Sequence, residues 1–163
     1  MATQKAYFAA GCFWGVEYYF QQKNGVISAI SGYMGGVTPN PSYKEVCSGL
    51  TGHLEVVEVN YEDTKVSFED LAKLFFEIHD FTQTNGQGPD IGSQYLSAIF
   101  YSNEEEKSVS KDLMQQLAAK GYDVATMLLS THNTPFFQAE EYHQDYYFKT
   151  GKTPYCHGYQ KIF

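Results

Sequence analysis

One cysteine near the start of the chain has neighbours that suit a reactive thiol. Cys12 lies in the pentapeptide GCFWG, between two glycines and directly before Phe13 and Trp14, the only tryptophan in the sequence. The following segment predicts a helix, so Cys12 falls at or near a helix N-terminus, where unpaired N–H groups stabilise a thiolate. The flanking glycines permit close approach of a ligand to the backbone. A reactive thiol and a buried structural cysteine both fit this position.

A second thiol, Cys156, stands near the C-terminus in the stretch TPYCHGY. A thiol on a mobile tail can reach another thiol when the tail swings, as a resolving cysteine does when it condenses with an oxidised partner. An unused exposed thiol is the alternative. The remaining cysteine, Cys47, has no special neighbours and is expected to be structural. Three widely spaced cysteines do not fit a secreted disulfide framework.

The carboxyl group of Glu55 lies in the alternating stretch HLEVVEVNY. A period of two places Glu55 on the same face as Val57, Val59 and Tyr61, either on the apolar face or at its mouth. A carboxyl group in apolar surroundings has a raised pKa and can donate a proton near neutral pH. The alternative is a strand-end glutamate turned to solvent, which the residues alone slightly favour.

Three other polar side chains could contribute to a pocket. Tyr43 lies in a predicted loop and Tyr95 at a predicted strand start, and each could hold a hydroxyl group over a pocket. Asp90 lies in the turn-like run GPDIGSQY, where it could simply cap the turn. The histidines fit no zinc spacing and no CxxC or HExxH pattern is present, so no metal site is expected.

The elements that must position these side chains follow from hydrophobic periodicity. Strands are predicted over 5–10, 26–34, 53–61, 94–101 and 124–129, and helices over 12–24, 67–79 and 102–120. Ser67 is expected to cap the second helix, and Ser102 with Glu105 to form a capping box on the third. Polar loops are predicted over 35–52 and 81–93, and residues 130–163 show no clear periodicity.

This order of elements predicts an α+β fold. We expect a two-layer sandwich of helices on a mixed β-sheet, with a ferredoxin-like core and a long irregular C-terminal tail. The 163 residues suit one domain, 1–163. A net charge of −8, without any arginine, argues against nucleic-acid and anionic membrane partners. The N-terminal stretch has neither a charged leader nor a long apolar run, so a cytoplasmic enzyme is expected.

Four stretches of the sequence resemble the A-type peptide methionine sulfoxide reductases. In chain order they are GCFWG, GYMGGVTPNPSYKEVCSGLTGHLEVVEVNY, HDFTQTNGQGPDIGSQYLSAIFY and FFQAEEYHQDYY. The resemblance covers essentially the whole chain and implies that the Cys12 thiolate attacks the sulfur of a methionine S-sulfoxide, free or in a protein. Cys12 would become a sulfenic acid, Cys156 would resolve it as a disulfide, and thioredoxin would reduce that disulfide. The resemblance implies no cofactor beyond these thiols, and we expect a monomer.

The same resemblance assigns roles around the sulfoxide. Phe13 and Trp14 would form the apolar pocket for the methyl group. Glu55 would be the protonated acid that donates a hydrogen bond and then a proton to the sulfoxide oxygen. Tyr43 and Tyr95 would share that oxygen.

The resemblance to the family also concerns Asp90 and the C-terminal tail. Asp90 matches a residue that helps organise the family's site, partly through water. The tail holds one cysteine where some members carry two, which argues against a second disulfide relay. Two other functions stay open: a cysteine hydrolase or acyltransferase with His53 or His143 as base, and a non-catalytic module that binds oxidised methionine.

Overall fold

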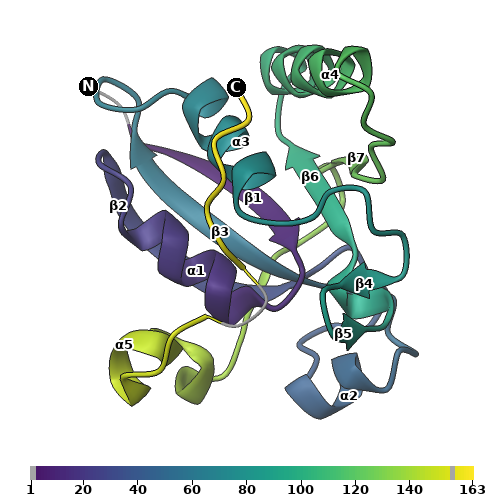
Figure 1. Cartoon of the computed structure of the whole chain (residues 1–163). Coiled ribbons are helices and arrows are strands. Elements are labelled where there is room, and N and C mark those ends of the chain that lie inside the picture. Colours follow the sequence, from purple (N-terminus) through teal and green to yellow (C-terminus); the bar gives the residue numbers. More distant parts are fainter. Residues whose placement is uncertain (1–2, 155–156) are drawn as a thin grey trace.

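The computed structural model describes residues 3–154 and 157–163, and its centre is a six-stranded sheet in the order β7-β6-β1-β3-β2-β8 (Figure 1). Neighbouring strands run antiparallel except β6 and β7, which are parallel, so the sheet is mixed as predicted. A separate two-stranded hairpin joins β4 and β5. The strands are β1 Thr3–Ala10, β2 Val26–Met34, β3 Leu54–Glu62, β4 Gly86–Gln87, β5 Asp90–Ile91, β6 Ser97–Tyr101, β7 Met127–Ser130 and β8 Phe137–Gln138.

The helices complete an α+β fold, which confirms the predicted class. Helices α1 and α3 lie on one face of the sheet, and α4 packs beside α3 (Figure 1). Aromatic rings fill the space between these layers: Phe8 of β1 stacks on Phe20 and on Phe75, with ring centroids 5.1 and 5.3 Å apart. The ferredoxin-like description of this core stays a prediction. The helices are α1 Phe13–Gln21, α2 Tyr43–Cys47, α3 Phe68–Glu77, α4 Glu104–Ala119 and α5 Tyr146–Thr150, with 3-10 turns η1 Ser93–Tyr95 and η2 Glu141–His143.

One of the two predicted helix caps is confirmed and the other is wrong. Ser67 caps α3, and its hydroxyl accepts the backbone N–H of Asp70 at 3.0 Å. The cap of α4 is Asn103 rather than Ser102, and its side chain accepts the N–H of Glu106 at 2.8 Å. Asparagine is among the strongest N-cap residues, so the helix begins after it.

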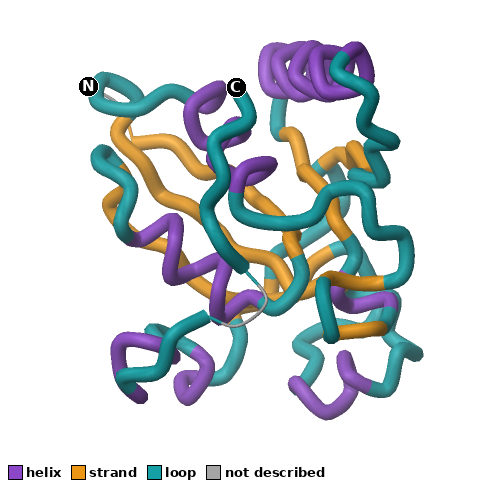
Figure 2. The backbone as a smooth tube through the Cα atoms, viewed as in Figure 1, coloured by secondary structure: helices purple, strands orange, loops and turns teal. Residues whose placement is uncertain are grey.

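The long segments predicted as loops contain short elements that periodicity does not reveal (Figure 2). Residues 35–52 include α2, and residues 81–93 include the β4-β5 hairpin. The tail predicted to be irregular contains β8, η2 and α5. Each of these elements spans only two to five residues, which is too few for a period of 2 or 3.6 to appear.

The last seven residues are bound to the rest of the molecule. The ring Nε2 of His157 donates to the carbonyl oxygen of Ala10 at 2.6 Å. Further along, the N–H groups of Gln160 and Ile162 donate to the backbone and side chain of Glu77, at 2.8 and 2.9 Å. Figure 1 shows this segment in yellow, passing in front of the sheet from the start of α1 towards α3.

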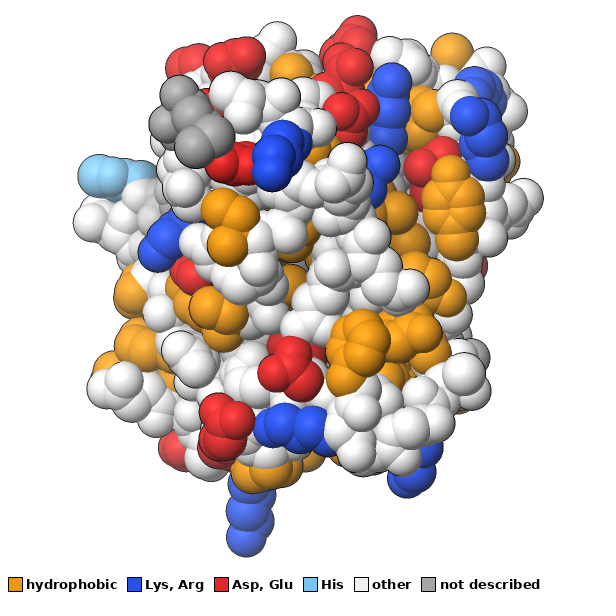
Figure 3. Space-filling view, turned by 90° about the vertical axis from the view of Figure 1, so that its left-hand side faces the viewer, with side chains coloured by type: hydrophobic (Ala, Val, Ile, Leu, Met, Phe, Trp, Pro, Cys, Tyr) orange, Lys and Arg blue, Asp and Glu red, His pale blue; other side chains and the backbone are white. Residues whose placement is uncertain are grey.

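On the face drawn in Figure 3, neither positive nor negative charge dominates the surface. Acidic and basic side chains are interspersed there, with apolar side chains between them. In the described part of the chain, no helix has both the length and the apolar character needed to cross a membrane.

Candidate active site

Cys12 is the N-cap residue of α1, so its predicted position at a helix start is confirmed. The turn from β1 into α1 is made by Gly11, whose φ of +93° is unfavourable for other residues. The Cys12 side chain is buried, with 6% of its surface exposed. The N–H groups of the first helical turn favour a negatively charged sulfur at this place.

The two glycines of GCFWG serve packing within the protein. A Cβ atom on Gly11 would lie 2.5 Å from the Cβ of Gln87. A Cβ atom on Gly15 would lie 2.2 Å from the Nδ1 atom of His157. The space expected for a ligand beside these glycines is therefore filled by Gln87 and His157.

Glu55 lies on β3, directly below the start of α1. Its Oε1 atom accepts the backbone N–H of Phe13 at 3.2 Å, and only 1% of its surface is exposed. The alternative of a glutamate turned to solvent is therefore wrong. Among the described residues, the Oε2 atom of Glu55 has no hydrogen-bond partner.

The surroundings of Glu55 keep its carboxyl group protonated. Burial raises its pKa well above the ordinary value, and the negative charges of Cys12 and Asp90 raise it further. The hydrogen bond from the Phe13 N–H acts in the opposite direction and is outweighed. A protonated carboxyl group beside a cysteine can act as a general acid.

The two predicted tyrosines meet at the same place. Tyr43 is the first residue of α2, and its hydroxyl group lies close enough to that of Tyr95 for each to affect the pKa of the other. Tyr95 ends η1 rather than starting a strand as predicted, because the pairing of β6 with β1 begins only at Ser97. Burial, followed by the charge of Glu55, raises the pKa of both tyrosines, so both hydroxyl groups keep their protons as donors.

Aromatic rings surround the start of α1. Phe13 is buried, and its ring lies 5.1 Å from that of His143 and 6.3 Å from that of Tyr43. The indole of Trp14 stacks on Tyr146 at 3.7 Å, and its Nε1–H donates to Nδ1 of His143 at 2.9 Å. These contacts fix the orientation of Trp14.

His143 is a site residue that the sequence did not single out as part of a sulfoxide site. It is fully buried, and burial lowers its pKa, so the ring is neutral. Its Nδ1 accepts from Trp14, so the proton of the neutral ring is on Nε2. Its only sequence signal is its place in the block FFQAEEYHQDYY.

The sequence also singled out an acidic residue, Asp90, and two further cysteines, Cys156 and Cys47. Asp90 belongs to β5, close enough for its charge to raise the pKa of Glu55. Cys156 lies outside the described residues. Cys47 was expected to be structural, but it is exposed at the end of α2, in the neighbourhood of Tyr43.

The histidines do not favour a cysteine hydrolase. His53 accepts the N–H of Gly36 at Nδ1 and donates from Nε2 to the carbonyl oxygen of Thr38, at 3.0 and 2.6 Å. Both ring nitrogens of His53 are therefore occupied within its own loop. His143 is bonded to Trp14 as described above, which leaves Nδ1 unable to accept a proton from Cys12.

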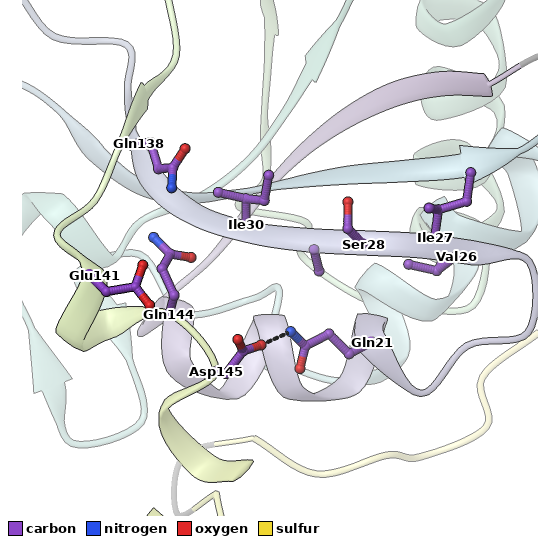
Figure 4. A pocket seen from close by; sticks show the side chains of 10 residues that line it. Gln21, Val26, Ile27, Ser28, Ile30, Gln138, Glu141, Gln144 and Asp145 are labelled. Atoms are coloured by element: carbon purple, nitrogen blue, oxygen red, sulfur yellow. Dashed lines mark hydrogen bonds between the residues drawn. The ribbon is translucent and has the colours of Figure 1, made fainter. Parts of the chain in front are cut away.

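A hollow of about 470 Å³ lies elsewhere, between the outer edge of β2 and the segment before α5 (Figure 4). Gln21 and Asp145 point toward each other across it, and the Nε2 of Gln21 donates to Asp145 at 2.5 Å. Of the predicted site residues that the structure describes, none lines this hollow. The candidate site is therefore the cluster around Cys12.

Comparison with known proteins identifies the family of the chain. A family model described as peptide methionine sulfoxide reductase matches residues 4–162. The peptide methionine sulfoxide reductase MsrA of Nautilia profundicola is 44% identical, over 93% of this chain and 87% of its own length. The crystal structure of Mxr1 from Saccharomyces cerevisiae in reduced form has a TM-score of 0.85 at 32% identity, covering 97% of this chain and 92% of that one.

A second Mxr1 structure, in complex with Trx2, has a TM-score of 0.63 at 23% identity and covers 97% of this chain and 90% of that one. At this identity the match shows a shared fold. The family assignment rests instead on sequence similarity, since the family model matches residues 4–162. The chain therefore belongs to the peptide methionine sulfoxide reductases, as an enzyme of the MsrA type that reduces methionine sulfoxide.

Proposed function

We propose that Cys12 is the nucleophile of this reductase and Glu55 its general acid. The Cys12 thiolate attacks the sulfoxide sulfur, the oxygen passes to Cys12, and methionine leaves with its sulfur reduced. The products are one methionine and one Cys12 sulfenic acid, so the two-electron change balances. The observation that carries this proposal is the buried Glu55, which accepts the N–H of the residue after Cys12 and whose pKa is raised by that burial.

Protonation of the sulfoxide oxygen makes the sulfur easier to attack. The Oε2 of Glu55, which no described residue engages, is free to give its proton to that oxygen. The hydroxyl groups of Tyr43 and Tyr95 lie near each other and near Glu55, and burial keeps both protonated, so both suit donation to the same oxygen. Asp90 contributes its negative charge, which helps keep Glu55 protonated.

Phe13 and Trp14 are proposed to bind the methyl group of the substrate. The Trp14 indole is held by stacking on one side and by its hydrogen bond to His143. A rigid apolar wall beside a chiral sulfur suits one epimer, and we assign the S epimer. The substrate is methionine S-sulfoxide, free or within an oxidised protein.

Regeneration is proposed to use Cys156 and thioredoxin. The Cys156 thiol condenses with the Cys12 sulfenic acid, which forms a disulfide and releases water. A thioredoxin dithiol then reduces this disulfide, and the Trx2 complex of yeast Mxr1 supports such a partner. We further propose that the chain acts as one cytoplasmic, monomeric domain, with no nucleic-acid or membrane partner.

Thiol counting tests this cycle. Without a reductant, the wild-type chain should lose two free thiols for each methionine it forms, as Cys12 and Cys156 join. Cys12→Ser should form no methionine. Cys156→Ser should form about one equivalent and then stall with thioredoxin, because the Cys12 thiolate has become a sulfenic acid and no resolving thiol is left to convert it into a disulfide.

Cys47→Ser is the matched control, and it should still lose two thiols per turnover. Turnover by Cys12→Ser would remove Cys12 as the nucleophile. Sustained turnover of Cys156→Ser with thioredoxin would show that another group resolves the sulfenic acid.

A further inference from the structure

Glu140 connects the protein core to the helix that carries Tyr43. It lies between β8 and η2, and its carboxylate accepts two hydrogen bonds from different parts of the chain. The hydroxyl of Tyr33 on β2 donates to its Oε1 at 2.8 Å. The backbone N–H of Tyr43 donates to its Oε2 at 2.9 Å.

The carboxylate of Glu140 is held in its charged form. Partial burial raises its pKa, but the hydrogen bonds from the Tyr43 N–H and the Tyr33 hydroxyl outweigh this, and the net pKa is lowered. Hydrogen bonds to an ionised acceptor are shorter and stronger than those between neutral groups. Both bonds therefore hold Glu140 firmly between β2 and α2.

The Glu140 carboxylate joins a rigid part of the protein, at Tyr33, to helix α2, which is not rigid by itself. Tyr33 is fully buried in the main core cluster. Helix α2 spans only Tyr43–Cys47, and a helix of one turn is not stable in isolation. Its local capping box, formed by Ser42 and Glu45, fixes its first turn but does not attach it to the sheet.

Tyr43, whose backbone is held by Glu140, is one of the residues proposed to contact the substrate. The Tyr43 ring lies 4.3 Å from that of His143, and its hydroxyl lies near that of Tyr95. A small shift of the Tyr43 backbone would move this hydroxyl away from the place that the sulfoxide oxygen must occupy. Displacements of about 1 Å can cost roughly 100-fold in rate.

We propose that Glu140 is a positioning residue for the reductase, which acts by holding the backbone of Tyr43 against Tyr33. This inference rests on the proposed role of Tyr43 as a donor to the sulfoxide oxygen. Glu140 itself touches no reacting atom in this scheme.

Single-turnover rates of methionine formation test the inference in the full-length chain. Glu140→Ala should slow this step by about 10- to 100-fold, because Tyr43 loses its anchor. Glu140→Gln should stay within about threefold of wild type. Its amide oxygen can still accept from Tyr43, and its amide N–H can donate to the Tyr33 hydroxyl. Glu141→Ala is the control, since the Glu141 side chain is exposed and pairs with the likewise exposed Lys149 rather than with Tyr43.

A double-mutant cycle separates positioning from a general loss of structure. If Glu140 acts through Tyr43, adding Tyr43→Phe to Glu140→Ala should slow the reaction by less than about twofold further. If the two effects instead multiply, Glu140 acts elsewhere and the inference is wrong. Amide hydrogen exchange gives a second readout: Tyr43 should exchange faster in Glu140→Ala and as in wild type in Glu140→Gln.

The outcomes also separate this inference from the proposed function. If Tyr43→Phe alone leaves the single-turnover rate unchanged, the proposed role of Tyr43 fails and the inference fails with it. If Tyr43→Phe slows the reaction and Glu140→Ala does not, only the inference fails.

Discussion

Gly15 lies inside α1, a position where alanine usually stabilises a helix by up to about 1 kcal/mol. Here the His157 ring occupies the space that a methyl group would need, 2.2 Å away. The ring cannot simply move aside, because its Nε2 is bonded to the carbonyl oxygen of Ala10. The identity of this glycine is therefore set by a residue near the opposite end of the chain.

We predict that Gly15→Ala destabilises the protein by about 1–3 kcal/mol, the usual cost of forcing extra volume into a packed site. Urea unfolding would measure this change. Gly158→Ala is the control, since a Cβ atom there has nothing within 4 Å and should change stability little. An increase in stability for Gly15→Ala would mean that helix propensity outweighs the contact with His157.

The protonated state of Glu55 gives the chemical step a defined pH dependence. Its raised pKa means that the acid form persists to higher pH than for an ordinary glutamate. The single-turnover rate should therefore be highest below this raised pKa and fall as the pH rises through it. Glu55→Gln should slow the step by about 100-fold or more and abolish this dependence.

Stopped-flow measurement of the single-turnover rate with a sulfoxide substrate, at a series of pH values, would test this dependence. Glu58→Gln is the matched control, because Glu58 lies on the same strand but faces the other side of the sheet. A Glu55→Gln rate near that of wild type would exclude the proton-donor role.

At the scale of elements, Glu17 joins α1 to its neighbours. Its Oε1 accepts the N–H of Asp145, at 2.7 Å, and its Oε2 accepts the Ser31 hydroxyl, at 3.2 Å. Burial raises its pKa to about 7, with a further increase from the charge of Asp145, against the hydrogen bonds from Asp145 and Ser31. Helix α1 is therefore attached to β2 and to the segment before α5 through a carboxyl group that titrates near neutral pH.

This attachment predicts a loss of stability as the pH rises. The unfolded chain releases the Glu17 proton near pH 4.5, whereas the folded chain keeps it until about pH 7. Stability should thus decrease between these values by about 3 kcal/mol for this group. Glu17→Gln should remove that part of the dependence, since its amide can still accept from Asp145 and donate to Ser31.

Urea unfolding at pH 5 and pH 8 would measure the difference. Glu69→Gln is the control, because Glu69 is exposed on α3 and pairs with Lys73 on the same helix. An unchanged pH dependence in Glu17→Gln would show that Glu17 is ionised throughout this range.

The elements also show what the sequence can predict. The strands and helices of five or more residues that build the sheet and its covering layer have a clear period, so they were predicted within a few positions. Helix α2 and the β4-β5 hairpin were not predicted, because contacts with distant residues hold them in place. The N–H of Tyr43 is bonded to Glu140, 97 positions away, and no local pattern can reveal such a partner.

The site follows the same rule. The helix start at Cys12 follows from the sequence pattern, whereas the alternating strand left both a buried and a solvent-facing Glu55 open, and the role expected for Glu55 came from the resemblance to the family. His143 and Glu140 were not predicted, since their contacts with Trp14 and Tyr43 depend on how remote segments meet. Gly15 was expected to permit the close approach of a ligand, because the sequence does not reveal that the His157 ring lies against it.

At the scale of the whole molecule, segments far apart in the sequence meet around Cys12, the proposed nucleophile. His157 is bonded to Ala10 across 147 positions, and Trp14 to His143 across 129. A chain is synthesised from its N-terminus, and early segments can fold before late ones exist. The nascent chain can therefore pair β1 with β3 while the residues that complete the surroundings of Cys12 are not yet made. Cys12 precedes His143 and His157 in the chain, so the surroundings of the proposed nucleophile are completed only after these later residues have been synthesised.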